Sequence, residues 1–166
     1  MAFTSPMDLL WTPWRRAFIE GASGDAETAC FLCTTSAAHD DRPNLILLRD
    51  ERAFVIMNRY PYNSGHLMIA PYAHTGDLPG LDRSTAQQLM TLTQRCVGVL
   101  QQAYQPQGFN VGMNLGKAAG AGVPDHVHLH VVPRWVGDTN FMPVVGHAKV
   151  LPETLDQTYD RLAPLF

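Results

Sequence analysis

The order of apolar and polar residues predicts three successive strands in the first half of the chain. Apolar, β-prone runs occupy 45–49 and 53–58, and a third run occupies 66–72. A charged turn at 50–52 separates the first two runs, and a turn-rich stretch at 60–65 precedes the third. This order predicts a hairpin that continues into an antiparallel meander.

The pattern then changes to helical spacing from 84 to about 104, where Leu89 and Leu100 are two of the recurring apolar residues. Ser84 followed by Gln87 is typical of a capping box at the start of a helix. We therefore predict one long helix in this part of the chain.

Two further strands, at 109–114 and 126–134, complete a set of antiparallel strands with segregated helices, which is an α+β fold. A short helix is predicted after the Thr-Pro pair at 12–13, and a tail helix at about 152–164. Small and polar residues at 21–44 predict a loop, apart from a pair of cysteines.

Length and composition favour a single domain, 1–166, with an N-terminal extension at 1–29. Apolar residues make up 46% of the chain and charged residues 16%, which suits a packed globular protein. The net charge of -3, without a Lys/Arg run, argues against a duplex nucleic acid as partner. The start lacks a secretory pattern and no apolar stretch approaches the ~20 residues of a membrane span, so we expect a cytoplasmic protein without a membrane partner.

Three histidines alternate with apolar residues in the sequence HVHLHVV. On a strand, His126, His128 and His130 would share one face. With ~3.3 Å of rise per residue, the outer two would lie ~13 Å apart, too far to bind one tetrahedral metal ion together. Three histidines on a solvated sheet face is the other plain interpretation, but it leaves their common register unexplained. We therefore favour the three as a catalytic group.

A neutral imidazole is a nucleophile near physiological pH when an acceptor holds its other nitrogen. His128 lies between two possible partners and is the candidate nucleophile. Its attack on an α-phosphorus would give a phosphoramidate that water or phosphate then cleaves, a double displacement that needs no metal. The glycine-rich loop at 114–125 suits phosphate binding, because glycines let backbone N–H groups approach anionic oxygens, although it matches neither the Walker nor the GxGxxG pattern.

With these residues the chain resembles the histidine triad family, whose motif is three histidines alternating with apolar residues and ending in two more. HVHLHVV matches every position. The segments LWTPWRRAFIEG, NRYPYNSGHLMIAPYAH, GFNVGMNLGKAAGAG and VVPRWVGDTNFMPV are similar to the bacterial diadenosine tetraphosphate phosphorylase-like branch, which is close to the fragile-histidine-triad group. The resemblance implies a five-stranded antiparallel sheet with one long helix and short terminal helices, in a homodimer that forms one continuous sheet.

The resemblance also implies a nucleotide substrate, a dinucleoside polyphosphate such as diadenosine tetraphosphate, cleaved through an AMP-histidine on His128. His130 would contact the phosphate or the leaving group. The implied substrate-binding residues are Asn58 and His66 near the nucleoside, Asn114, Gly120, Ala121 and Gly122 at the phosphates, and Trp135 on a base. Gly122 stands where many members have Ser or Gln, so only its backbone can contribute there.

Cys30 and Cys33 are spaced as one edge of a tetrahedral zinc site. Zinc-bearing members of the wider family imply His74 and His126 as the other ligands of a structural zinc, which would leave His128 free for catalysis. Reduced core thiols are the alternative interpretation. A redox role is less favoured, because no helix is predicted to start at the pair and lower a thiol pKa.

Other functions stay open at this point. A phosphoramidase of the same family would use the same nucleophile, and a nucleotide- or zinc-binding protein with little catalysis would need none. Either phosphate or water can complete the turnover, and the resemblance favours phosphate.

Overall fold

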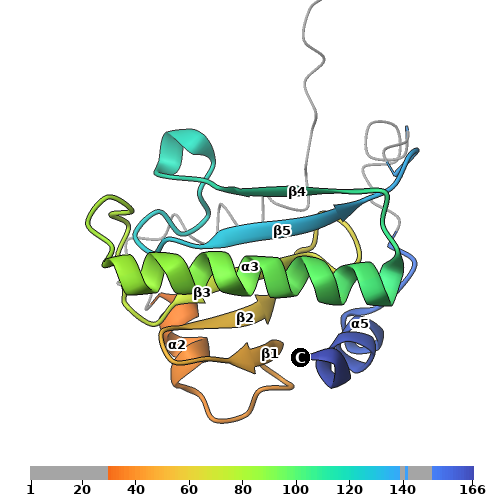
Figure 1. Ribbon diagram of the computed structural model, residues 1–166, viewed down its shortest axis with the longest axis horizontal. Coiled ribbons are helices and arrows are strands. Elements are labelled where there is room, and N and C mark those ends of the chain that lie inside the picture. The colour runs from red at the N-terminus through yellow and green to blue at the C-terminus, as the bar shows by residue number, and fades with distance from the viewer. Residues whose placement is uncertain (1–29, 139–140, 142–150) are drawn as a thin grey trace, which may run out of the picture.

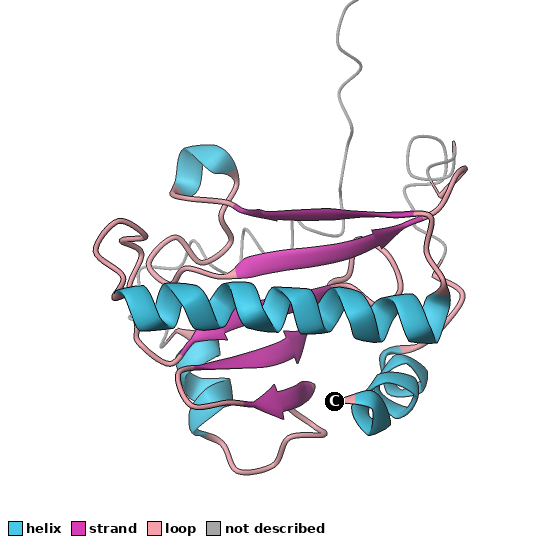
Figure 2. Cartoon of the chain, viewed as in Figure 1, coloured by secondary structure: helices cyan, strands magenta, loops and turns pink. Residues whose placement is uncertain are grey.

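The structure, a computed structural model, describes residues 30–138, 141 and 151–166. It is an α+β arrangement in which one long helix crosses a single sheet (Figure 1, Figure 2). The short helix expected after residues 12–13 lies outside the described residues, as does the whole N-terminal extension, 1–29.

Five strands form the sheet in the order β1-β2-β3-β5-β4, and every neighbouring pair is antiparallel. This confirms the predicted fold class and the meander of the first three strands. The strands are β1 (Ile46–Arg49), β2 (Ala53–Met57), β3 (Leu67–Pro71), β4 (Gly108–Met113) and β5 (Leu129–Arg134).

The long helix α3 (Arg83–Tyr104) covers one face of the sheet (Figure 2). Leu129 and Val131 of β5 pair with Ile69 and Leu67 of β3, and all four are buried in the core with the apolar side of α3. Because side chains alternate along a strand, the residues between them face the other side of the sheet. That second face is therefore available for chemistry.

The start of α3 differs from the prediction in its cap. The helix begins at Arg83, and the side chain of Asp82 accepts a hydrogen bond from the Thr85 N–H at 3.0 Å. The Ser84 hydroxyl donates to the same Asp82 carboxylate, so Ser84 is not the cap that its spacing to Gln87 predicts. An aspartate at this position satisfies a helix N–H that otherwise has no partner within the helix.

The tail helix is present as α5 (Leu155–Leu162), shorter than the predicted 152–164 and followed by the 3-10 turn η2 (Ala163–Leu165). A capping box begins it, since the Thr154 side chain accepts from the Gln157 N–H and the Gln157 side chain accepts from the Thr154 N–H. Leu162 lies in the core and anchors the helix beside β1.

Within the predicted loop 21–44, the prediction is wrong at 31–37, because a helix, α2 (Phe31–Ala37), follows Cys30 directly, and it is confirmed at 38–44, where the chain forms bends and turns. The seven residues of α2 are mostly small or polar, so the composition carries no helical signal. Leu32 is fully buried in the core, and this tertiary contact replaces local propensity as the stabilising factor.

The strand predicted at 126–134 begins only at Leu129. Before it, the Val127 N–H donates to the Thr75 carbonyl at 2.7 Å, outside the ladder of the sheet. The three triad histidines therefore do not share one strand face, and His126 is turned away from the other two.

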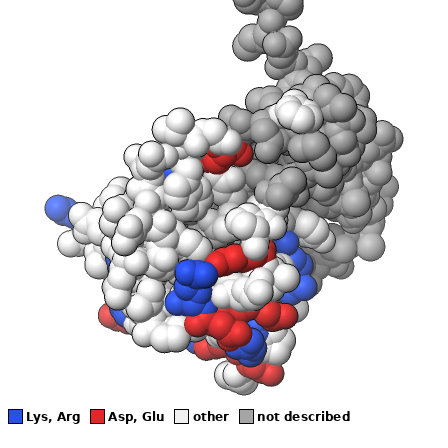
Figure 3. All heavy atoms as spheres, turned by 90° about the vertical axis from the view of Figure 1, so that its right-hand side faces the viewer, with Lys and Arg blue, Asp and Glu red and all other residues white. Residues whose placement is uncertain are grey.

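No helix among the described residues is long and apolar enough to cross a membrane. On the face that carries α5, basic and acidic side chains are intermixed (Figure 3). They include the ion pairs Arg42–Asp160 and Arg161–Glu153, so the described part of this face presents no stripe of a single charge.

Candidate active site and metal centre

A cross-strand row of side chains forms the floor of a pocket on the face opposite α3. Ile56 of β2 pairs with Met68 of β3, and Met68 pairs with His130 of β5. The pocket over this row, called the histidine pocket below, has a volume of about 340 Å³. Its lining residues are Phe31, Thr35, Asn44, Leu45, Ile56, Met57, Asn58, Arg59, Tyr60, Tyr62, Met68, Asn114, Gly122, Val123, His128 and His130.

His128 faces this pocket, and one of its two ring nitrogens already makes a hydrogen bond to the backbone. Its Nδ1 lies 2.8 Å from the His126 carbonyl oxygen, so Nδ1 carries the proton and donates it. The lone pair is consequently on Nε2. Burial lowers the pKa of His128, against the opposing effect of the His126 carbonyl, and favours the neutral ring. This is the state that a nucleophilic histidine requires.

His130 has the opposite protonation pattern. The Tyr62 N–H donates to His66 Nδ1 at 3.1 Å, so the proton of a neutral His66 is on Nε2. His66 Nε2 lies 2.9 Å from His130 Nδ1 and donates to it. His130 therefore keeps its own proton on Nε2. The ring centroids of His128 and His130 lie 4.9 Å apart. The site therefore combines an Nε2 lone pair on His128 with an Nε2–H donor on His130.

The structure shows His66 as a buried residue in contact with His130, and its expected place near the nucleoside stays a prediction. His66 is 1% exposed, lies behind His130 and does not line the histidine pocket. Its backbone is held by the preceding glycine: Gly65 has φ +77°, and a Cβ there would lie 2.9 Å from Leu100 Cδ2. Only glycine suits this conformation and this close approach to α3.

A second, more open depression, the β4 groove, adjoins the histidine pocket and has a volume of about 440 Å³. The two share Tyr62, Asn114 and His130, so they form one continuous surface past the histidines. The other residues of the groove are Asn63, Asn110, Val111, Gly112, Met113, Val132 and Arg134.

The glycine-rich loop contributes unequally to the site. Asn114 and Gly122 line the histidine pocket, as does Asn58, whose Oδ1 accepts from the Tyr60 N–H. Gly120 and Ala121 are not among the lining residues, and their N–H groups donate to the Lys117 and Gly116 carbonyls. In this conformation the loop bonds to itself at these two positions, as part of the 3-10 turn η1 (Lys117–Ala119).

Trp135 lies just beyond the far end of β5 from His128. Its ring meets that of Tyr104 edge-on, with 6.4 Å between centroids. The structure does not bring Trp135 into the histidine pocket or the β4 groove. Its expected stacking on a base stays a prediction.

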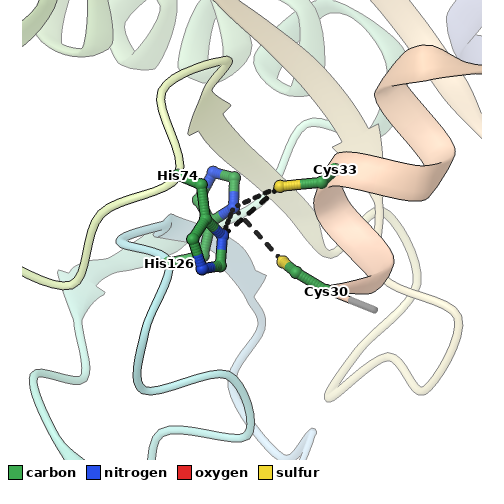
Figure 4. Close-up of side chains that lie close together, drawn as sticks. All are labelled: Cys30, Cys33, His74 and His126. Carbon is green, nitrogen blue, oxygen red and sulfur yellow. Dashed lines mark hydrogen bonds between the residues drawn. The ribbon is translucent and has the colours of Figure 1, made fainter. Parts of the chain in front are cut away.

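Two sulfur and two nitrogen atoms converge beside the active site, in the group Cys30, Cys33, His74 and His126, called the metal cluster below (Figure 4). His126 Nδ1 lies 3.3 Å from Cys30 Sγ and 3.4 Å from His74 Nδ1. Cys33 Sγ lies 3.3 Å from His74 Nδ1. Ligands on a tetrahedral zinc ion would be ~3.3–3.8 Å apart, so the donor atoms fit such an ion.

The surroundings of His126 also suit a metal ligand. Its Nε2 lies 2.8 Å from the Pro71 carbonyl, which holds the proton on Nε2 and leaves the Nδ1 lone pair directed at the cluster. The ring is fully buried, whereas His74 is exposed. These four residues can hold a metal ion, as the family resemblance implies.

A helix does begin next to Cys30, so the prediction that no helix starts at the cysteine pair is wrong. The Cys33 thiol is nevertheless not activated: burial raises its pKa, and the neighbouring Cys30 raises it further. A metal ion would displace the thiol protons and make the thiolates ligands.

Several pocket residues were missed by reasoning from the sequence. The apolar floor of Ile56 and Met68 could have been found from strand alternation, given the pairing order of the strands. Phe31 and Thr35 had no signal, because α2 was not predicted. Tyr62 lies within the NRYPYNSGH segment, but its backbone role could not be read from residue type.

Comparison with known proteins agrees with this geometry. The HIT domain family matches residues 40–136. Over 159 residues the chain is 37% identical to a Mycobacterium tuberculosis protein named AP-4-A phosphorylase, covering 93% of this chain and 82% of that protein. It is 28% identical over 93 residues to Bis(5'-adenosyl)-triphosphatase of Dictyostelium discoideum, covering 56% of this chain and 62% of that protein.

Among solved structures, a Zn-bound histidine triad family protein from Mycobacterium smegmatis superposes with a TM-score of 0.67 at 25% identity. The superposition covers 84% of this chain and 94% of that one. The HIT domain match spans more than half of the chain, and the M. tuberculosis protein is similar over nearly all of it. The chain therefore belongs to the HIT domain family.

Proposed function

We propose that this enzyme cleaves dinucleoside polyphosphates, with diadenosine tetraphosphate as the leading substrate, through a nucleotidyl group carried on His128 Nε2. The observation that carries the proposal is the set of hydrogen-bond contacts that assigns opposite tautomers to His128 and His130, both of which line one pocket. The names of the relatives from M. tuberculosis and D. discoideum support the substrate class.

The first step forms a bond between His128 Nε2 and the α-phosphorus, and breaks the bond from that phosphorus to the bridging oxygen. His128 keeps its Nδ1 proton, so the phosphorylated ring is cationic and is stabilised by the His126 carbonyl at 2.8 Å. His130 Nε2–H donates a hydrogen bond to the departing oxygen. With diadenosine tetraphosphate the leaving group is ATP, and AMP stays on the histidine.

In the second step a phosphate oxygen attacks the same phosphorus, and neutral His128 leaves. The products of the whole reaction are then ADP and ATP. We propose phosphate rather than water as the acceptor, supported by the name of the M. tuberculosis relative. Hydrolysis would instead give AMP and ATP.

Two adjoining cavities suit a substrate with two nucleosides. The apolar floor of the histidine pocket fits one nucleoside, with its α-phosphorus at His128. The β4 groove continues from His130 and offers room for the rest of the polyphosphate chain and the second nucleoside. Asn114 and the Gly122 backbone lie where they could bind phosphate oxygens, and Asn58 lies on the nucleoside side.

We also propose a zinc ion held by Cys30, Cys33, His74 and His126 in a structural role, outside the chemical steps. Unpaired thiols acting as ligands fit a reducing compartment, which supports a cytoplasmic location. A homodimer is proposed through β4, an end strand of the sheet with Asn110, Val111 and Gly112 exposed.

The experiment is nucleotide analysis combined with trapping. Purified enzyme with diadenosine tetraphosphate labelled at the α-phosphorus is quenched and tested for an acid-labile, base-stable label on the protein. We expect label on wild type and none on His128→Asn, with kcat reduced at least 10³-fold in the variant. Products with and without phosphate distinguish phosphorolysis from hydrolysis.

Two outcomes would overturn the proposal. Unchanged turnover in a His128→Asn variant that binds AMP normally would exclude His128 as the nucleophile. Turnover of an adenosine phosphoramidate much faster than of any dinucleotide would exclude the proposed substrate class, while leaving the nucleophile in place.

A further inference from the structure

We propose that the metal cluster holds α2 as one wall of the histidine pocket, so that metal binding and nucleotide binding strengthen each other. This inference rests on the nucleotide-binding function proposed above. It gives the metal a role in substrate binding as well as in the fold.

The residues of α2 divide among three surroundings. Cys30, just before the helix, and Cys33 are three positions apart and point together at the two histidines of the metal cluster (Figure 4). Phe31 and Thr35 are four positions apart, on a different side of the helix, and both line the histidine pocket. Leu32 is fully buried in the core. One short helix thus connects the cluster directly to the pocket.

The two ends of α2 are held differently. At the C-terminal end, Arg49 donates to the Ser36 carbonyl at 2.5 Å and to the Ala38 carbonyl at 2.6 Å. At the N-terminal end, Cys30 in the cap position makes no side-chain capping bond. A helix of seven residues has little stability of its own. In the described part of the chain, the polar side-chain contacts that hold the end carrying Phe31 are therefore those of Cys30 and Cys33 with the cluster histidines.

A metal ion would strengthen those contacts, because it replaces weak sulfur–nitrogen contacts with coordinate bonds. A nucleotide in the pocket would press on Phe31 and Thr35 from the other side. Each ligand would bind more tightly to a protein in which the other had already ordered α2. By linkage, zinc must raise the affinity for nucleotide by the same factor as nucleotide raises the affinity for zinc.

A second route between the two sites exists and has to be separated from the first. The His126 carbonyl accepts from His128 Nδ1, so a metal on His126 could also act on the nucleophile. The path from His126 to His128 does not involve Phe31 or Thr35. Removing these two side chains therefore tests the α2 route alone.

The experiment measures AMP binding by titration calorimetry, with wild type in its zinc-loaded form and after removal of the metal by a chelator. We expect the Kd for AMP to rise at least five-fold in the metal-free protein. The affinity for zinc, measured by competition with a chromophoric chelator, should rise by the same factor when AMP is saturating. Hydrogen exchange should become faster in 31–37 of the metal-free protein and stay unchanged in the sheet.

The decisive variant is the double substitution Phe31→Ala, Thr35→Ala, which keeps all four cluster residues. It should still bind zinc, bind AMP more weakly, and show the same AMP affinity with and without the metal. Ala37→Ser, at an exposed position of the same helix outside the pocket, is the matched control and should keep the coupling of wild type.

Four other outcomes of these binding and unfolding measurements would contradict the coupling through α2 or the proposed function. Equal AMP affinity of zinc-loaded and metal-free wild type would overturn the inference and leave the proposed function intact, whereas no AMP binding in either form would contradict the function itself. Coupling that persists in the double variant would assign it to the His126 route. Global unfolding of the metal-free protein in circular dichroism would overturn the inference too, since the metal would then support the whole fold.

Discussion

His66 determines which nitrogen of His130 carries a proton, although it does not line the histidine pocket itself. Its Nε2–H donates to His130 Nδ1 at 2.9 Å, and the Tyr62 N–H fixes its own tautomer. His66→Leu removes the donor and lets His130 place its proton on Nδ1. We expect kcat to fall about 10–100-fold, by analogy with the loss of a hydrogen-bond partner of a metal-binding histidine. KM for the dinucleotide should change much less.

A purely structural role for His66 would give a different result. His66→Gln keeps an amide N–H donor, and we expect it to restore much of kcat, whereas loss of packing alone would not be repaired by the donor. The protonated nitrogen of His130, read from its ring ¹⁵N shifts, should change in the leucine variant and not in the glutamine variant. Equal shifts in wild type and His66→Leu would contradict this assignment.

Among the elements, the turn segment before β3 is held to the end of β5 by one carboxylate. Asp138 accepts from Arg134 at 2.6 and 2.7 Å and from Asn63 Nδ2 at 2.7 Å, and its side chain is only 10% exposed. Arg134 is the main reason that the pKa of Asp138 lies well below its usual value. A lowered folded-state pKa means that this stabilisation is present above the unfolded pKa of about 3.9 and is lost as pH falls below it.

We therefore expect Asp138→Asn to lower the free energy of unfolding by about 1–2 kcal/mol at pH 7, because charge-assisted hydrogen bonds to Arg134 become neutral ones. The difference from wild type, measured by urea denaturation, should shrink as pH falls below about 4, because Asp138 is then protonated in the unfolded wild-type chain while it is still ionised in the fold. Asp156→Asn, which removes an exposed carboxylate on α5, is the control and should show a much smaller effect. A difference that stays constant down to pH 2 would refute the account.

Elements differ in how far the sequence predicts them, and the reasons are physical. Helical spacing predicts α3 to within one residue, because 22 residues give a long periodic record. The same spacing argument does not predict α2, because its seven residues are stabilised by Leu32 in the core and by Arg49 from β1. A short helix held by distant contacts leaves no periodic pattern.

The candidate site shows the same division. His128 and the four residues of the metal cluster could be named from motif, spacing and family resemblance, and the structure brings the cluster together. The contact of His66 with His130 joins residues 64 positions apart. Its geometry depends on the β3–β5 pairing, which no local pattern reveals. The turn of His126 away from the triad strand is likewise set by a bond from Val127 to the Thr75 carbonyl.

For the whole molecule, the two edges of the sheet are not equivalent. At β1, the Ile46 N–H donates to the Asp41 carbonyl, and the Ile46 carbonyl accepts from the Tyr159 hydroxyl of α5. The edge strand β4 is longer, and Val111 is 47% exposed on it. Within the described ranges no further strand pairs with the outer edge of β4, and an unpaired edge strand pairs readily with another strand, so β4 is the edge suited to a second copy of the chain.

The proposed homodimer can be tested at this edge. Val111→Lys places a charge on β4, and we expect it to weaken dimerisation at least ten-fold in sedimentation equilibrium, because two copies would bring like charges together across the paired strands. Met90→Lys changes an exposed methionine on α3 by the same charge and should leave the dimer intact. A monomeric wild type would refute the dimer, and a Val111→Lys variant that dimerises as tightly as wild type would show that the copies associate elsewhere. The β4 groove borders the same strand. If the two copies pair through β4, the dimer interface lies within reach of the second half of a dinucleotide substrate.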